Sequence, residues 1–112
     1  MKFIAFLAFV AAVSATIVQI TPDDKCEDSL IAPTYSDCGA NIVSPTIYKR
    51  GIRIIQNEHG VIFYKNWRCT GDATFEVKGP VSEGEQCYDL KKFGVDPNKP
   101  ACIYIVCPAW SD

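Results

Sequence analysis

The stretch VIFYKNWRCTGDATFEV, residues 61–77, decides the fold. Residues 61–65 are β-branched or aromatic side chains followed by a lysine, a composition typical of a strand. Cys69 and Gly71 lie in the loop that follows. Residues 73–77 then alternate apolar and polar side chains, so that one set faces a core and the other faces solvent. The stretch therefore predicts two strands joined by a folded loop.

Similar short segments occur on both sides of it. A four-residue turn, Asn57 to Gly60, joins residues 51–56 to residues 61–65 and predicts a hairpin centred on Glu58 and His59. No apolar period of 3.6 residues is sustained over ten residues, and no internal repeat is evident. Recurring short strands separated by turns predict an all-β sandwich or barrel. Besides 61–65 and 73–77, the expected β segments are residues 16–20, 46–48, 51–56, 86–90 (a strand or a turn) and 101–107, with loops at 29–39 and 91–100.

The first fifteen residues, MKFIAFLAFVAAVSA, have the pattern of a secretory signal peptide. Lys2 precedes an apolar run that is too short to cross a bilayer, since a span needs about 20 residues. Small residues follow at the expected cleavage point after Ala15. We therefore expect residues 16–112 to be exported as a single disulfide-rich β domain.

An exported chain with six cysteines predicts a disulfide framework. Cys102 and Cys107 flank an expected strand, where five positions separate two Cα atoms by about 17 Å. A disulfide needs Cα atoms within about 7 Å, so these two cysteines should have different partners. The same spacing disfavours a zinc site, which typically uses closely spaced cysteine pairs. The expected disulfide residues are Cys26, Cys38, Cys69, Cys87, Cys102 and Cys107.

Residues 61–77, then Cys87-Tyr88-Asp89-Leu90, then residues 103–106, resemble a Greek-key motif of the βγ-crystallin type. The series is most similar to small, killer-toxin-like secreted fungal proteins that carry this motif with disulfides. The resemblance spans about half of the chain after residue 15. It implies a small disulfide-stapled Greek-key sandwich.

The resemblance also implies roles for single residues. Phe63 and Tyr64 correspond to the strand aromatics and Gly71 to the glycine of the tight turn. Several members of the class bind calcium through Asp- or Asn-rich loops that end in hydroxyl residues. Asp23 and Asp24 lack such a hydroxyl pair, so we expect no metal, because calcium needs six to eight oxygen ligands in one place.

The composition offers little for catalysis. His59 is the single histidine and falls in an expected turn, whereas a nucleophile needs an oriented base beside it. The acidic residues considered for an acid–base pair show no apolar setting that would separate their pKa values; they are Glu76, Glu83, Glu85 and Asp89. We expect no enzyme activity and no cofactor.

Lys49 and Arg50 form a dibasic pair. Processing proteases of exported fungal proteins cut after such pairs, but a solvated bend between two strands is the favoured interpretation. Intact mass of the exported protein would decide between them.

Aromatic side chains are the best candidates for partner binding, because they bury much area with few rotatable bonds. Trp67, Tyr88 and Trp110 are the predicted partner-binding residues, with Tyr64 as a further candidate. Each of them also suits the core of a small domain.

The function expected from these features is that of a secreted effector-type protein of a host-associated fungus. It would act outside the cell by binding a host extracellular protein or a cell-wall carbohydrate. The alternatives are a killer-toxin-like antimicrobial protein and an extracellular inhibitor or carbohydrate-binding module. Residues 16–112 carry a formal charge of −3, since Lys2 is lost from a chain of net charge −2. That charge disfavours a toxin acting on acidic microbial surfaces and gives no support for nucleic-acid binding.

Overall fold

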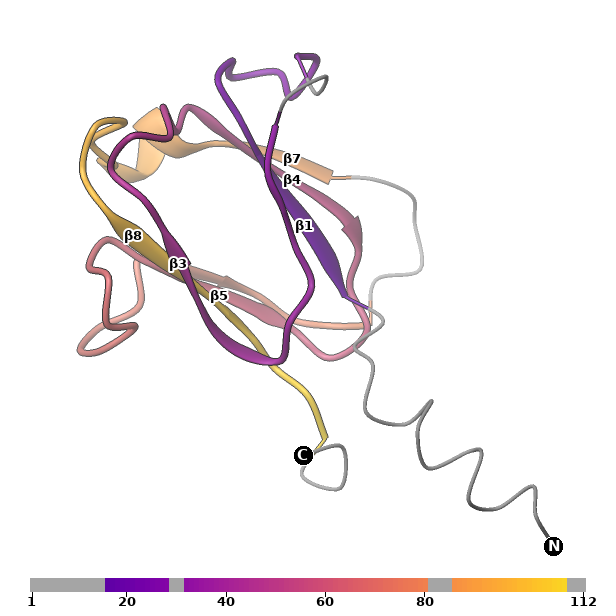
Figure 1. Ribbon diagram of the computed structural model, residues 1–112. Coiled ribbons are helices and arrows are strands. Elements are labelled where there is room, and N and C mark those ends of the chain that lie inside the picture. Colours follow the sequence, from indigo (N-terminus) through magenta and orange to yellow (C-terminus); the bar gives the residue numbers. More distant parts are fainter. Residues whose placement is uncertain (1–15, 29–31, 81–85, 109–112) are drawn as a thin grey trace, which may run out of the picture.

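The computed structural model describes residues 16–28, 32–80 and 86–108. Two four-stranded antiparallel sheets face one another (Figure 1). The elements are β1 (Ile17–Thr21), β2 (Thr34–Tyr35), β3 (Gly39–Val43), β4 (Gly51–Gln56), β5 (Val61–Tyr64), β6 (Phe75–Val77), β7 (Gln86–Asp89), the 3₁₀ helix η1 (Leu90–Phe93) and β8 (Ala101–Ile105).

The strand order shows two interlocked Greek keys. Sheet A has the order β2-β1-β4-β7, and sheet B has the order β3-β8-β5-β6. In the first half of the chain, β1 pairs with β2, β3 joins the other sheet, and β4 returns beside β1. In the second half, β5 pairs with β6, β7 crosses to sheet A, and β8 returns beside β5. The expected disulfide-stapled Greek-key sandwich is confirmed.

The loops that follow β1 and β5 repeat one local structure. Asp23 and Asn66 each accept hydrogen bonds from two backbone N–H groups later in their own loop. Cys26 and Cys69 each lie three residues further on, with φ angles of 56° and 54°. The two loops thus share the placement of a cysteine with left-handed backbone three residues after an Asp or Asn, a similarity that few identical residues reveal.

The core lies between the sheets and consists of the inward side chains of alternating strand positions. Phe63 is fully buried and stacks on Phe75 at 5.4 Å between ring centroids. Phe75 also stacks on Phe93 of η1 at 4.4 Å, which closes the sandwich on that side. The buried cluster comprises Val18, Ile20, Val43, Ile52, Ile54, Val61, Phe63, Leu90, Val95, Ala101, Ile103 and Ile105.

The predicted hairpin between residues 51–56 and 61–65 is wrong. β4 pairs with β1 and β7, whereas β5 pairs with β6 and β8, so the turn between them joins the two sheets. Asn57 is buried in this turn. Its Oδ1 accepts a hydrogen bond from the Gly60 N–H at 2.8 Å, and its Nδ2 donates to the Val77 carbonyl at 3.2 Å. These two bonds give the buried Asn57 side chain its polar partners in the turn that leads from sheet A into sheet B.

Three further expectations need correction. Residues 46–48 form a turn, where Ile47 N–H donates to the Ser44 carbonyl, and not a strand. The expected loop at 91–100 begins inside η1, which Asp89 caps by accepting from the Lys91 N–H. The expected loop at 29–39 contains the two-residue strand β2, and its residues 29–31 lie outside the described part of the chain.

All six cysteines form disulfides. The pairs are Cys26–Cys87, Cys38–Cys107 and Cys69–Cys102. The prediction that the two C-terminal cysteines have different partners is confirmed. One disulfide ties the β1–β2 loop to β7, one continues the β3–β8 pairing beyond its end, and one holds the β5–β6 loop against β8.

Candidate functional site: the outer face of sheet B

The outer face of sheet B is apolar although it faces solvent. Along β3, Asn41 and Val43 are buried while Ile42 is 59% exposed. Along β8, Ile103 and Ile105 are buried while Tyr104 between them is 40% exposed. The alternation of a strand thus places apolar side chains on both faces of sheet B.

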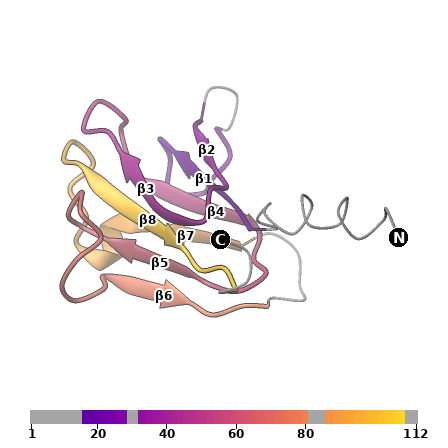
Figure 2. The same ribbon diagram turned by 60° about the horizontal axis from the view of Figure 1, so that its bottom comes forward.

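Strand register brings these outward side chains into two cross-strand rows. Tyr104 lies opposite Ala40 of β3 on one side and opposite Ile62 of β5 on the other. In the next row, Cys102 lies between Ile42 and Tyr64. The four strands of the sheet run side by side in Figure 2. We call this set (Ala40, Ile42, Ile62, Tyr64 and Tyr104) the sheet B platform.

Trp67 lies at the border of the platform because a disulfide holds its loop there. Cys69 bonds to Cys102, with 5.2 Å between their Cα atoms, and Cys102 occupies an outward position in β8. Trp67, two residues before Cys69, is 48% exposed. The guanidinium of Arg68 lies over the Trp67 ring, 4.7 Å from its centroid. The loop that carries Trp67 and Arg68 is therefore attached to the outward side of β8.

The platform carries few charges. The outward positions of β3, β5 and β8 hold the platform residues and Cys102. Glu76 lies opposite Ile62, on the edge strand β6. Two formal charges lie at the margins, Glu76 on the edge strand β6 and Arg68 in the loop after β5. This arrangement suits a ligand without a net charge.

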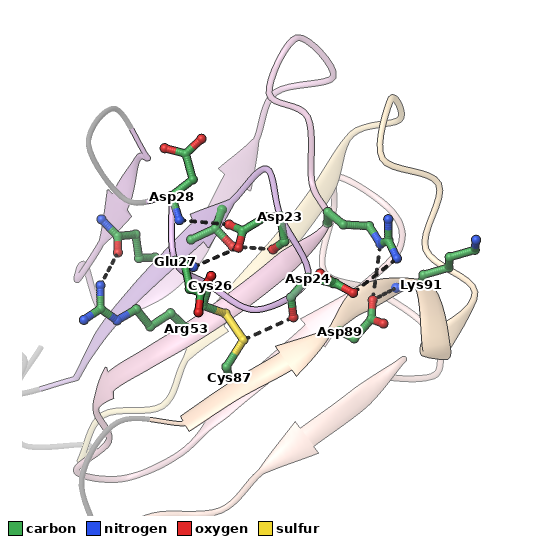
Figure 3. The surroundings of a disulfide bond; sticks show 12 residues. Asp23, Asp24, Cys26, Glu27, Asp28, Arg53, Cys87, Asp89 and Lys91 are labelled. Carbon is green, nitrogen blue, oxygen red and sulfur yellow. Dashed lines mark hydrogen bonds and ion pairs between the residues drawn. A yellow bond between two sulfur atoms is a disulfide. The ribbon is translucent and has the colours of Figure 1, made fainter.

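The outer face of sheet A is different in character. Gln19 and Arg53 lie side by side across β1 and β4, and the Arg53 guanidinium donates to the Gln19 Oε1 at 3.3 Å. The Cys26–Cys87 disulfide continues this row and attaches the β1–β2 loop to it (Figure 3). The outer face of sheet A is therefore polar, whereas the outer face of sheet B carries exposed apolar side chains around the Cys69–Cys102 disulfide.

The carboxylates around that disulfide have structural partners (Figure 3). Asp23 accepts hydrogen bonds from the backbone N–H groups of Glu27 and Asp28, which lowers the pKa of its carboxyl. Asp24 and Asp89 both pair with Arg50, at 3.7 and 3.4 Å. These interactions close the loop between β1 and β2 against the start of β4. We therefore assign this acidic cluster to folding.

Of the predicted partner-binding residues within the described chain, Trp67 is exposed in a loop and Tyr88 faces the core. Trp67 borders the sheet B platform. Tyr88 is half-buried against the core, with its ring centroid 5.7 Å from that of Phe75 and its hydroxyl donating to the Gln86 Oε1 at 3.0 Å. Trp110 lies outside the described residues, as does the predicted signal peptide. Tyr64, the further candidate, belongs to the platform.

Ile42 and Tyr104 were not singled out from the sequence. Ile42 lies between Asn41 and Val43, which both face inward, so a polar and an apolar residue share the inner face of β3. The available signal was in Ile103-Tyr104-Ile105, where an aromatic residue occupies the outward position between two core isoleucines. Exposure of these two side chains depends on β3 and β8 being neighbours, which the sequence pattern does not show.

The other residues considered for chemistry lie apart. His59 is exposed in the turn between β4 and β5. Glu76 is exposed on β6, and Asp89 caps η1 and pairs with Arg50. Glu83 and Glu85 lie outside the described residues. Within residues 16–28, 32–80 and 86–108, no group of three or more His, Cys, Asp or Glu side chains is placed to hold a metal ion.

The sequence favoured a solvated bend at the dibasic pair, but the structure shows that Lys49 is not solvated. Lys49 is fully buried, and its Nζ donates to the carbonyls of Ile47 at 2.7 Å and Ser44 at 3.2 Å. Burial lowers the pKa of the Lys49 ammonium, and the nearby charge of Asp96 acts in the opposite direction. Lys49 thus closes the 44–48 turn from inside.

Comparison with known proteins finds no matching family model, no matching curated protein and no matching solved structure. Within the part of the chain that the structure describes, no helix is long and apolar enough to span a membrane. Three disulfides in so small a domain are typical of extracellular proteins.

Proposed function

We propose that this chain is a secreted, non-catalytic binding protein of the effector type, and that its target-binding surface is the sheet B platform. The observation that carries the proposal is the exposure of Ile42 and Tyr104 on neighbouring strands, next to Ile62 and Tyr64. Single exposed apolar residues are common on proteins, but a contiguous group is typical of an interaction site.

The platform side chains do not belong to the buried core of the sandwich. The core is complete on the inner face of sheet B, where Phe63, Ile103 and Ile105 are fully buried. The outward apolar residues add little to that core and raise the risk of aggregation. The outer face of sheet A shows that this chain can cover a sheet with polar side chains. A binding role explains why sheet B differs.

The place of action follows from the disulfides and the first fifteen residues. Three disulfides favour an oxidising compartment, and the amino-terminal pattern favours export. The sequence of residues 61–77, 87–90 and 103–106 resembles small secreted fungal proteins of the βγ-crystallin type. A host-associated fungus is the source that this resemblance implies.

Binding to host tissue tests the proposal. Fluorescently labelled folded protein is applied to tissue of candidate hosts, beside the double variant Ile42→Ser/Tyr104→Ser. Both changes lie at solvent-exposed positions, so the variant should keep its fold, which circular dichroism checks. We expect extracellular retention of the wild type and at least tenfold less of the variant, since central interface residues cost more than about 1.4 kcal/mol when truncated.

Two controls accompany this measurement. Reduced and alkylated protein should not bind, because the platform requires the folded sheet. A growth-inhibition assay on microbial cells tests the killer-toxin alternative, and killing at low dose would contradict the effector proposal. Equal retention of wild type and variant would show that the platform is not the binding surface.

A further inference from the structure

We propose that the ligand of the sheet B platform is a neutral, linear polysaccharide that lies across the strands and stacks on Tyr64, Trp67 and Tyr104. This inference rests on the proposed function and specifies the partner of the same surface. It follows from the size of the platform, from its charges and from the groups it exposes.

The size of the platform favours an extended chain over a second protein. Four strands about 4.8 Å apart and three to five residues long, at about 3.3 Å per residue, give a face of at most roughly 300 Å². Stable protein interfaces bury about 800 Å² on each partner. A second copy of this chain packed on the platform alone would fall well short of that area. A few sugar rings of an extended glycan fit a flat strip of these dimensions.

The charges favour a neutral ligand. Ile42, Ile62 and Tyr104 present no charge, and Arg68 and Glu76 lie at the margins with opposite signs. An anionic polymer would meet one cation and one carboxylate, without net attraction. A neutral polymer can cover the uncharged rows without removing a charged group from water.

The exposed groups match the chemistry of a sugar ring. Pyranose rings have an apolar face of C–H groups, which packs against the negative face of an aromatic ring, and an equatorial rim of hydroxyls. Among the described residues, the hydroxyls of Tyr64 and Tyr104 have no hydrogen-bond partner, in contrast to that of Tyr88. They are therefore available to the hydroxyls of a ligand.

Strand register also places the rings suitably. Tyr104 lies opposite Ile62, and Tyr64 opposite Cys102, so the two tyrosines are diagonal neighbours on β5 and β8. Such diagonal positions are about 7–8 Å apart. Trp67 continues this series beyond the end of β5, held by the Cys69–Cys102 disulfide. Two tyrosines of the platform and a tryptophan of the attached loop thus offer three aromatic rings to consecutive sugar units.

The test is sedimentation of the disulfide-intact exported protein with amorphous cellulose, chitin and insoluble β-1,3-glucan. We expect binding to at least one of the three, with less than a twofold change between 50 and 500 mM NaCl, because a neutral ligand leaves little for salt to screen. Tyr104→Ala and Trp67→Ala should each weaken binding about tenfold. Polygalacturonate, an anionic polymer, should not compete.

Tyr48→Ala is the matched control. Tyr48 is 48% exposed, as Trp67 is, but it lies in the 44–48 turn, outside the platform. Its truncation should leave polysaccharide binding unchanged. The inference is overturned if none of the three polysaccharides binds. It is also overturned if Tyr104→Ala and Trp67→Ala both bind as the wild type does.

Enzymatic treatment of the tissue separates this inference from the proposed function. Platform-dependent retention that survives glucanase and chitinase digestion but not protease would leave the platform as the binding surface and refute the polysaccharide. Loss of retention after glycan digestion alone supports it. Retention that does not depend on the platform variants would refute both.

Discussion

The buried ammonium of Lys49 shows how a single residue can reverse an interpretation drawn from sequence. A Lys-Arg pair before a glycine is typical of an exposed processing site. Here the Lys49 side chain instead satisfies two carbonyl groups in the interior of a turn. A buried carbonyl without a donor is costly, at about 1–3 kcal/mol, and a lysine long enough to reach two of them offsets its own desolvation.

We predict that the folded protein resists trypsin at this pair. The Lys49 side chain cannot enter a protease pocket while it is buried. The backbone N–H of Arg50 donates to Thr21, and its carbonyl accepts from Leu90, so the segment cannot adopt the extended contacts that a protease needs. Mass spectrometry of timed digests checks this. The reduced and alkylated chain should be cut after both residues, and equally fast cleavage of the folded form would contradict the prediction.

Asp23 should contribute to stability against acid. Hydrogen bonds from the Glu27 and Asp28 N–H groups lower its folded-state pKa below the ordinary value of 3.8. The unfolded chain therefore binds more protons in the interval between the two pKa values. The stabilisation is complete above the ordinary value and is lost as the pH falls through the folded pKa.

Replacing that carboxylate tests its role. Asp23→Asn keeps one acceptor oxygen and cannot titrate, so at pH 7 it should lower the free energy of unfolding by less than about 1 kcal/mol. The difference between variant and wild type should shrink as the pH falls below 4. Urea unfolding at pH 7, 4 and 2.5 measures both free energies, and a difference that is constant with pH would contradict the assignment.

At the scale of strands, the sequence predicted which segments form strands better than it predicted which strands pair with one another. Residues 51–56 and 61–65 are strands, as their composition indicates, and the turn between them is real. The same alternation suits two strands in one hairpin and two strands that face each other across a sandwich. Which arrangement forms depends on β1 and β8, the distant strands that pair with β4 and β5. A local pattern carries no information about those neighbours.

The repeated loop left a short signal in the sequence. Asp23-Asp24-Lys25-Cys26 and Asn66-Trp67-Arg68-Cys69 share an Asp or Asn, a basic residue and a cysteine at the same spacing. Side-chain oxygens of Asp and Asn are suited to accept backbone N–H groups in such turns. The sheet B platform left a weaker signal in the sequence, since the exposure of Ile42 and Tyr104 depends on the pairing of β3 with β8. Composition alone located Trp67 and Tyr64.

The Cys38–Cys107 disulfide should hold the edge strand β3 in place. Cys38 directly precedes Gly39, and Cys107 lies two residues after Ile105, so the disulfide closes the end of the β3–β8 ladder with 5.8 Å between its Cα atoms. The double variant Cys38→Ser/Cys107→Ser should lose about 2–5 kcal/mol of stability. Amide exchange should quicken most in β3, because an edge strand has one neighbour. Unchanged protection of the β3 amides would show that the ladder alone suffices.

The whole molecule is interlocked, since each half of the chain supplies a strand to the sheet of the other half. Sheet A needs β7 from the second half, and sheet B needs β3 from the first. The Cys26–Cys87 and Cys38–Cys107 disulfides also join the halves. Neither sheet can therefore open without exposing the core that both share.

We accordingly predict that the two sheets unfold together. Amide protons of the central strands β4 and β8 should exchange with the same free energy of opening, equal to that of global unfolding measured by urea. Native-state hydrogen exchange by NMR at increasing urea concentration compares them. The edge strands β2 and β6 are short and should open earlier by fraying, so they are excluded from the comparison. If β4 exchanged with a markedly lower free energy than β8, sheet A would be a separate unit, and the interlocked Greek keys would not act as one cooperative structure.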